Sequence, residues 1–146
     1  MKILIDGDGC PVKKEIVSLA KKYQVPVTLV TSFDHYSQKN QTTDFSTVYV
    51  DRGADSADYK IVALAEKGDV CVTQDYGLAS LLLAKGVTVF HQRFQYQKET
   101  IDFLLQTRFV GQMLKKSGKH QKGPTPFTNA DHQAFTILFE NYLKTI

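Results

Sequence analysis

The chain has 146 residues, which is enough for one domain with a sizeable core but not for two. Hydrophobic residues make up 42% and charged residues 23%, a globular composition that excludes disordered and fibrous proteins. The net charge of +3 is uneven: residues 1–90 hold 10 Lys and Arg against 11 Asp and Glu, whereas residues 91–146 hold 8 against 4. An acidic first part and a basic second part suit a phosphate-bearing substrate, although a difference of this size also arises by chance.

The sequence carries no sign of export or membrane insertion. No apolar run approaches the ~18 residues of a membrane span. The apolar N-terminal run meets Asp6 before a signal peptide could form. Two cysteines, Cys10 and Cys71, are too few for a disulfide framework and are typical of reduced thiols. We therefore expect a cytoplasmic protein with no membrane partner.

Five short apolar runs rich in β-branched residues predict strands. They lie at residues 2–6, 26–32, 47–51, 69–74 and 86–91. Near-continuous apolar runs are typical of parallel strands that are covered on both faces. Helical patterns follow the first, third and fourth runs, and Gly68 and Gly86 are expected to stop the last two of these helices. This alternation predicts an α/β fold, an open and mostly parallel Rossmann-like sheet with flanking helices.

The remaining segments complete a single domain over residues 1–146. Residues 33–46 are polar and aperiodic, which predicts a loop, and residues 99–114 have the spacing of an amphipathic helix. A basic connector containing Gly and Pro follows at 115–127. The last helix is expected at 129–146, capped by Thr128 or Asn129, with an apolar stripe that packs on the core.

Aspartates gather where the predicted strands end. They are Asp6 and Asp8 after the first run, Asp51, Asp55 and Asp58 after the third, and Asp75 after the fourth. In open parallel sheets, ligands bind outside the carboxyl ends of the strands. Two carboxylates ~4 Å apart repel by roughly 4 kcal/mol at an effective dielectric near 20, so a cluster of them favours a cation. Oxygen ligands suit Mg²⁺ or Mn²⁺. Taken singly, Asp8, Asp55 and Asp58 could instead be helix caps or turn residues.

The segment after the first run contains further candidate functional residues. Gly7 and Gly9 allow a sharp turn, and a helix that begins near Cys10 and Pro11 would point its amides at the same edge, where they could hold phosphate. Cys10 is either a nucleophile with a lowered pKa or a small packed side chain. The four histidines lack metal-ligand spacing, and neither a P-loop nor a Gly-x-Ser-x-Gly elbow is present. A zinc site, an NTPase and a serine hydrolase are therefore disfavoured.

Several motifs resemble those of the YaiI/YqxD family over nearly the whole chain. They are IDGDGCP at 5–11, GADSAD at 53–58, GD at 68–69 with VTQD at 72–75, GP at 123–124 and DHQAF at 131–135. This resemblance implies a bacterial, cytoplasmic protein of an uncharacterised family with a PIN-like fold, a class that includes metal-dependent nucleases. Carried over by motif, the acidic set of those nucleases falls on Asp6, Asp58 and Asp75, with Asp8 and Asp55 as further metal ligands. The chain departs from the family at Gly7 and Gly9, where alanine is usual, and at His132, where arginine is frequent.

The leading hypothesis is a metal-dependent nuclease that hydrolyses phosphodiester bonds, with single-stranded RNA as the favoured substrate. Asp6, Asp58 and Asp75 would hold one or two Mg²⁺ or Mn²⁺ ions, which polarise the scissile phosphate and activate a water. Either Thr73 or Asp8 would orient that water. Phosphate contacts are expected from Lys13, Arg93 and the basic run 115–122, which includes Lys115 and Lys116. Arg93 and the basic run could equally be solvated surface.

Two alternatives remain open from the sequence. Residues 3–9 resemble the start of a haloacid-dehalogenase-type phosphatase, with Asp6 as nucleophile and Asp8 as acid and base. Against this, Cys10 stands where that class has threonine. The other alternative is a non-catalytic module that binds nucleic acid or protein and keeps a metal only for stability. Phe90, Phe94 and Tyr96 alternate like packing residues of a strand edge and do not predict a stacking platform.

Overall fold

A computed structural model describes residues 1–7, 10–33, 42–51, 56–116 and 126–146. In chain order the elements are β1 (Ile3–Asp6), α1 (Lys13–Lys22), β2 (Val27–Ser32), β3 (Ser46–Val50), α2 (Ser56–Leu64), β4 (Val70–Val72), α3 (Tyr76–Ala84), β5 (Thr88–Phe90), α4 (Lys98–Lys116) and α5 (Asn129–Leu143). Each of the five strands lies within or next to a run that the sequence predicts.

The strands form one parallel sheet in the order β3-β2-β1-β4-β5. β1 lies in the middle, with Ile5 opposite Leu29 of β2 on one side and Val72 of β4 on the other. Strands β2 and β3 therefore extend the sheet on one side of β1, and the later strands β4 and β5 extend it on the other side. This arrangement confirms the prediction of an open, parallel, Rossmann-like α/β sheet.

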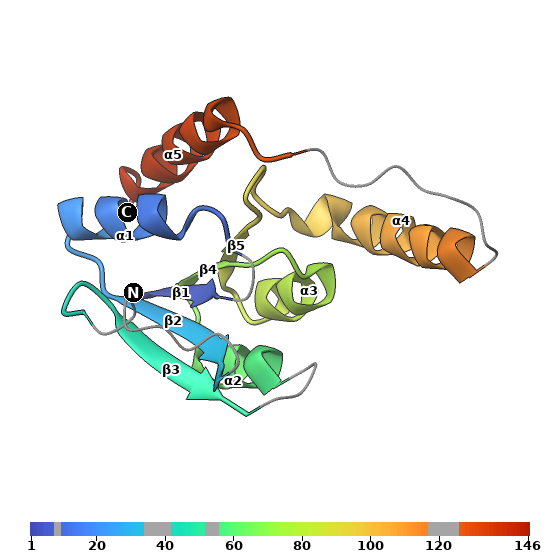
Figure 1. Cartoon of the computed structure of the whole chain (residues 1–146), viewed down its shortest axis with the longest axis horizontal. Coiled ribbons are helices and arrows are strands. Elements are labelled where there is room, and N and C mark those ends of the chain that lie inside the picture. The colour runs from blue at the N-terminus through green and yellow to red at the C-terminus, as the bar shows by residue number, and fades with distance from the viewer. Residues whose placement is uncertain (8–9, 34–41, 52–55, 117–125) are drawn as a thin grey trace.

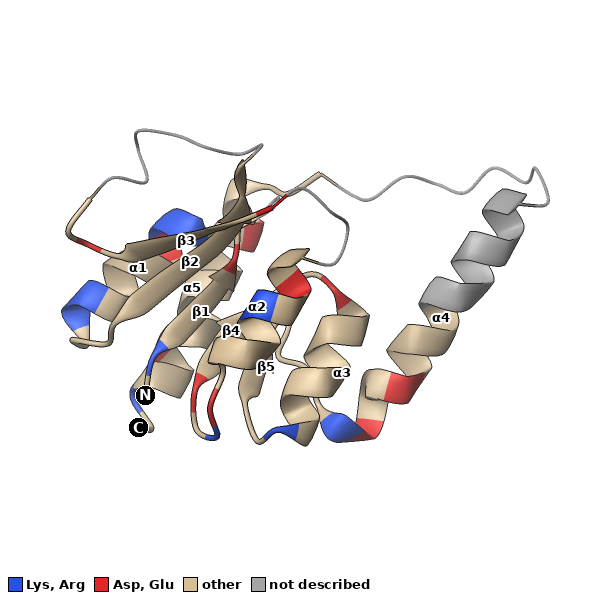
Figure 2. Ribbon diagram, turned by 90° about the horizontal axis from the view of Figure 1, so that it is seen from below, with Lys and Arg blue, Asp and Glu red and all other residues tan. Residues whose placement is uncertain are grey.

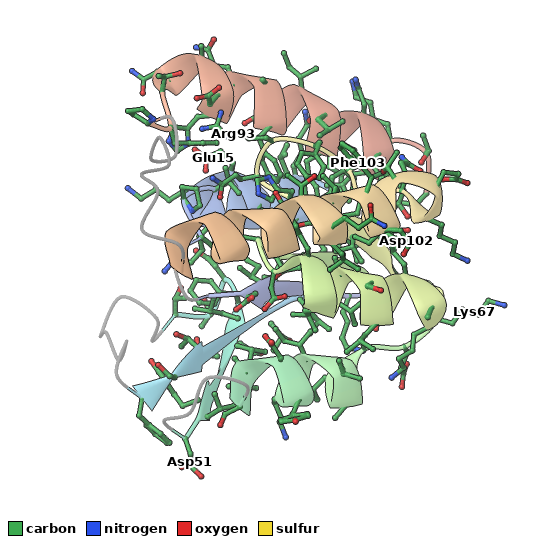
Figure 3. All side chains as sticks on the ribbon, turned by 90° about the vertical axis from the view of Figure 1, so that its right-hand side faces the viewer. Glu15, Asp51, Lys67, Arg93, Asp102 and Phe103 are labelled. Carbon is green, nitrogen blue, oxygen red and sulfur yellow. The ribbon has the colours of Figure 1, made fainter. Side chains whose placement is uncertain are left out.

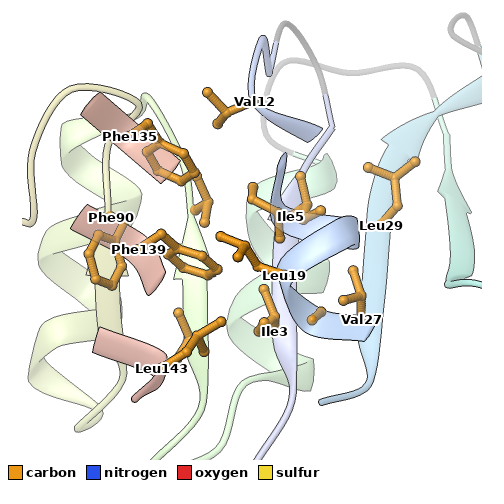
Figure 4. Close-up of a cluster of buried hydrophobic side chains, with 14 residues drawn as sticks. Ile3, Ile5, Val12, Leu19, Val27, Leu29, Phe90, Phe135, Phe139 and Leu143 are labelled. Atoms are coloured by element: carbon orange, nitrogen blue, oxygen red, sulfur yellow. The ribbon is translucent and has the colours of Figure 1, made fainter. Parts of the chain in front are cut away.

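Helices cover both faces of the sheet (Figure 1), and β1, β2, β4 and β5 are mostly buried, whereas the edge strand β3 is only partly buried. One core lies between the sheet and helices α1 and α5, where Ile5, Ile16, Phe135 and Phe139 pack together (Figure 4). A second core, which includes Leu4, Ile61 and Leu82, joins the other face to α2, α3 and α4. Burial on both faces explains why the strands have near-continuous apolar sequences rather than alternating ones.

The turn after β1 differs from its sequence prediction. α1 begins at Lys13 with Val12 as its N-cap, which offers no side-chain hydrogen bond, so Cys10 and Pro11 precede the helix. Gly7 donates its N–H to the Val30 carbonyl at 2.8 Å, and a Cβ at this position would lie 2.6 Å from Leu29 Cδ1. Glycine, which has no Cβ, therefore lets the backbone pass close to β2 here.

The C-terminal elements follow the prediction closely. α4 continues through Lys115 and Lys116, the first residues of the expected connector, and residues 117–125 lie outside the described part of the chain. α5 begins after a capping box in which the Thr128 hydroxyl accepts from the Asp131 N–H and the Asp131 carboxylate accepts from the Thr128 N–H. No helix in the described ranges has both the length and the apolar character needed to cross a membrane.

Candidate functional site at the carboxyl edge of the sheet

The order in which strands are added to the sheet reverses between β1 and β4, because β2 and β3 lie on one side of β1 and β4 and β5 on the other. The carboxyl ends of β1 and β4 define the candidate site. Asp6 is the last residue of β1, and Thr73 follows the last residue of β4. Crevices at such a reversal are where open α/β sheets bind ligands. Figure 2 shows acidic ribbon segments at the ends of β1 and β3 and at the starts of α2 and α3, all on this side of the sheet. The backbone therefore places these acidic segments on one side of the sheet.

A buried threonine connects two of the predicted acidic residues. The Thr73 hydroxyl donates to Asp6 Oδ2 at 2.8 Å, and its oxygen accepts the Asp75 N–H at 3.0 Å. The side chain of Thr73 is almost fully buried, and its carbonyl accepts the hydroxyl of Tyr96 at 3.2 Å. Thr73 is therefore held from two sides, and it fixes the orientation of the Asp6 carboxylate.

Asp75 has a structural role that the sequence interpretation did not assign to it. It lies beyond the end of β4 and is the N-cap of α3, where its Oδ1 accepts the Leu78 N–H at 3.0 Å. A capping carboxylate also interacts favourably with the positive end of the helix dipole. One oxygen of Asp75 is thus engaged in starting α3.

A small pocket opens beside Asp6. Its lining comes from both sides of the strand reversal and consists of Asp6, Cys10, Val72, Thr73, Gln74 and Gln92. Its free space of about 10 Å³ is close to what one water molecule needs. The buried amide oxygen of Gln92 has no hydrogen-bond partner among the residues that the structure describes. An unsatisfied buried acceptor costs about 1–3 kcal/mol, so a donor such as water is expected to complete this pocket.

No sequence motif pointed to Gln92, because it lies in the turn after β5 and joins Asp6 in one pocket only through the fold. That turn is well defined: the His91 N–H donates to the Phe94 carbonyl, and the ring of His91 stacks on Phe94 at 4.5 Å. Burial, assisted by the positive charge of Arg93, lowers the pKa of His91 to about 4. His91 is therefore neutral at physiological pH.

Both cysteines are unreactive thiols in this structure. Burial raises the pKa of Cys10 to about 11, and the charge of Asp6 acts in the same direction. Burial also raises the pKa of Cys71, with added contributions from the charges of Asp6 and Asp58. The packed side chain is thus the better interpretation of Cys10, since a nucleophile needs a lowered pKa.

The predicted metal ligands are brought together only in part. Asp58 lies in the first turn of α2 and is absent from the lining of the Asp6 pocket. Within the described ranges, no three His, Cys, Asp or Glu side chains form a group that could hold a metal ion. Asp8 and Asp55, the other two predicted ligands, lie outside those ranges.

The predicted phosphate-binding residues have varied surroundings. Lys13 is the first residue of α1, and its ammonium group lies 6.0 Å from the centre of the Phe45 ring. Arg93 pairs with Asp131 at 3.3 Å and stacks over Phe127, so it is tied to the start of α5. In the view of Figure 3, Arg93 and Asp51 lie at opposite ends of the molecule. Lys115 and Lys116 belong to α4.

The family model and the similar sequences agree on one family. The model of an uncharacterised bacterial family, YaiI/YqxD, matches residues 4–145. UPF0178 proteins of Bacillus mycoides (strain KBAB4) and Bacillus thuringiensis subsp. konkukian (strain 97-27) are 54% and 55% identical over 144 residues, covering 98% of this chain and 99% of theirs. Among solved structures, Rae1 (YacP) from Bacillus subtilis, as a W164L mutant, has 13% identity and a TM-score of 0.46 over 99% of both chains.

Proposed function

The chain belongs to the YaiI/YqxD family, and from that premise and the acidic edge of its sheet we propose that it is a divalent-metal-dependent nuclease acting on single-stranded RNA. The observation that carries this proposal is the position of Asp6. Its carboxylate stands at the carboxyl end of β1, beside the strand reversal, and is oriented by the buried hydroxyl of Thr73. Phosphodiester hydrolysis needs such a fixed anionic group close to a place for water.

The donor atoms beside the Asp6 pocket are of the kind that a hard cation prefers. Asp6 offers carboxylate oxygen, and Gln92 offers an amide oxygen that has no partner among the described residues. Cys10 stays protonated and does not act as a soft thiolate ligand. Oxygen-only donors favour Mg²⁺ or Mn²⁺ over zinc. We propose that Asp6 and Asp58 hold the ion, together with Asp8, Asp55 and Asp75. When bound, the ion would lower the pKa of a coordinated water and offset negative charge on the phosphate.

The protein's own residues have separate tasks in this proposal. Thr73 holds the Asp6 carboxylate in place, and the amide oxygen of Gln92 is available to accept a hydrogen bond from a water molecule that enters the pocket. Lys13, at the start of α1, contacts a substrate phosphate. Arg93 keeps α5 in position through Asp131 and reaches a phosphate only if it leaves that pair. Lys115 and Lys116 add to the electrostatic attraction of the nucleic acid.

The test is cleavage of an end-labelled single-stranded RNA by the purified chain in Mn²⁺, Mg²⁺ or EDTA. We expect slow cleavage that requires the metal and is abolished by Asp6→Asn, because the amide is a weaker cation ligand. Asp44→Asn is the matched control, since Asp44 is an exposed carboxylate that pairs with Lys21 at 3.5 Å, outside the proposed site. Equal cleavage by the Asp6→Asn preparation would contradict the proposal. A phosphoryl group retained on Asp6 after incubation with p-nitrophenyl phosphate would overturn it in favour of the phosphatase.

A further inference from the structure

A second concave surface lies at the carboxyl end of β3. It is a groove of about 470 Å³ between β3 and α2, within the size range of small-ligand sites. The residues that matter for its chemistry are Tyr49, Asp51, Ser56, Tyr59 and Lys60. We call it the β3–α2 groove. It is separate from the Asp6 pocket, with which it shares no lining residue.

Two tyrosines, Tyr49 and Tyr59, line the groove. Tyr59 is 74% exposed, although burial of an aromatic ring is normally favourable. Phe33, which directly follows β2, does not line the groove, but it is 56% exposed and stacks on Tyr49 at 5.6 Å with the two rings nearly parallel. Two lining tyrosines, one of them backed by an exposed ring, amount to more than the single scattered apolar residues common on protein surfaces.

The polar groups of the groove select the class of ligand. Lys60 and Asp51 contribute one positive and one negative charge, so the groove as a whole does not favour a bare anion. Figure 3 shows Asp51 pointing outward beyond the end of β3. A nucleotide of a single strand satisfies all of these groups, because its base has a flat π face for stacking and N–H donors for a carboxylate, and its phosphate suits Lys60.

We propose that the β3–α2 groove holds an unpaired nucleotide of single-stranded nucleic acid, with its base stacked on Tyr59 and its phosphate at Lys60. The position of α2 links this groove to the acidic edge. Asp58, one of the proposed metal ligands, directly precedes Tyr59 and Lys60 in the first turns of α2. The groove and the proposed metal ligand Asp58 therefore share the first turns of one helix. The inference rests on the proposed function, since it names a subsite for the same substrate.

The experiment measures binding separately from cleavage. Fluorescence anisotropy of a labelled single-stranded RNA of mixed sequence is recorded in EDTA, where a metal-dependent reaction cannot occur. Stacking of one base is worth about 1–3 kcal/mol, so Tyr59→Ala should weaken binding roughly 5- to 150-fold. Tyr59→Phe, which keeps the ring, should bind within about twofold of the unmodified chain. Lys60→Ala should weaken binding and reduce its dependence on salt concentration.

Phe103→Ala is the matched control, because Phe103 is also a highly exposed aromatic residue but lies on α4. Equal losses for Tyr59→Ala and Phe103→Ala, or none for Tyr59→Ala, would overturn the proposal. So would a change in oligomeric state on Tyr59→Ala, measured by analytical ultracentrifugation, because the groove would then be an interface between two copies of the chain. RNA binding that depends on Tyr59 without any cleavage in Mn²⁺ would support the groove while contradicting the nuclease.

Discussion

The hydroxyl of Thr73 joins the two strands that flank the reversal of the sheet, because it donates to Asp6 Oδ2 at 2.8 Å across 67 residues of sequence. The same oxygen accepts the N–H of Asp75, the residue that caps α3. One side chain thus couples the end of β1 to the start of a helix on the other side of the reversal. This coupling makes Thr73 a positioning residue for Asp6.

Replacement of Thr73 should therefore affect both stability and function. Thr73→Val keeps the shape of the side chain but leaves the Asp75 N–H and an Asp6 oxygen without this partner. We expect the free energy of unfolding to fall by about 1–3 kcal/mol in urea denaturation. Thr73→Ser keeps the hydroxyl and should restore most of the RNA cleavage that Thr73→Val loses. Equal behaviour of the two variants would show that the hydroxyl has no positioning role.

Binding of a divalent cation should stabilise the folded chain. A cation that binds the carboxylates at the sheet edge only in the folded state shifts the unfolding equilibrium toward that state. At a concentration one hundred times the dissociation constant the gain is about 2.7 kcal/mol, which corresponds to several degrees in the unfolding temperature. Thermal scans with and without Mn²⁺ measure this effect. Asp6→Asn should remove the shift and Asp44→Asn should keep it, whereas no shift in the unmodified chain would exclude a metal site of this strength.

The ion pair between Lys2 and Asp69 should make stability depend on pH in the acid range. Burial raises the pKa of Asp69, but the hydrogen bonds from the Lys2 side chain at 2.7 Å, from the Glu66 N–H and from the Lys2 N–H outweigh it, so the pKa lies below its usual 3.8. As the pH falls, Asp69 is therefore protonated in the unfolded chain before it is protonated in the folded chain. The stabilisation is therefore complete above the unfolded pKa and is lost as the pH falls through the folded one.

Asp69→Asn tests this linkage. At pH 7 we expect the variant to be less stable by about 1.5–3 kcal/mol, because it loses charge-assisted hydrogen bonds at a buried site. The difference in unfolding free energy between the variant and the unmodified chain should shrink below about pH 4. There Asp69 becomes protonated, first in the unfolded chain and at lower pH in the folded one. Urea denaturation at a series of pH values measures both quantities. A difference that stays constant down to pH 2 would contradict the assigned cause.

His91 should stay neutral at pH values at which an ordinary surface histidine is already protonated. Its pKa falls from 6.5 to about 4 because of burial and the nearby charge of Arg93. Between these values the unfolded state is protonated and the folded state is not, so His91 lowers stability as the pH falls from about 6.5 to about 4. Above about pH 6.5 the neutral form predominates in both states and the full stability is present. NMR titration of the imidazole should detect no protonation until well below pH 6, and a midpoint near 6.5 would refute the prediction.

Much of the architecture follows directly from the order of residues. Short apolar runs such as 26–32 and 86–91 are too short for core helices and rich in β-branched residues, so they predict strands. Gly86 has a φ of +83° where α3 ends, a conformation that favours glycine in any context. Asp6 could be placed at the sheet edge because a strand's last residue reaches that edge regardless of how the helices pack. Local pattern and strand direction were sufficient for these predictions.

The chemistry of the site depended on contacts between distant segments. The sequence showed Thr73, Gln92 and Arg93 as separate polar residues. Only the packing of distant segments gave Thr73 and Arg93 their partners and brought Gln92 into the lining of the Asp6 pocket. The same packing lowered the pKa of His91 and raised that of Cys10, because burial penalises the charged form of either side chain. Tyr59 became a candidate contact through the hollow between α2 and β3, a shape that no local pattern encodes. The sequence by itself determined the strands and the edge where they end, whereas distances, burial and concavity were decided by tertiary structure.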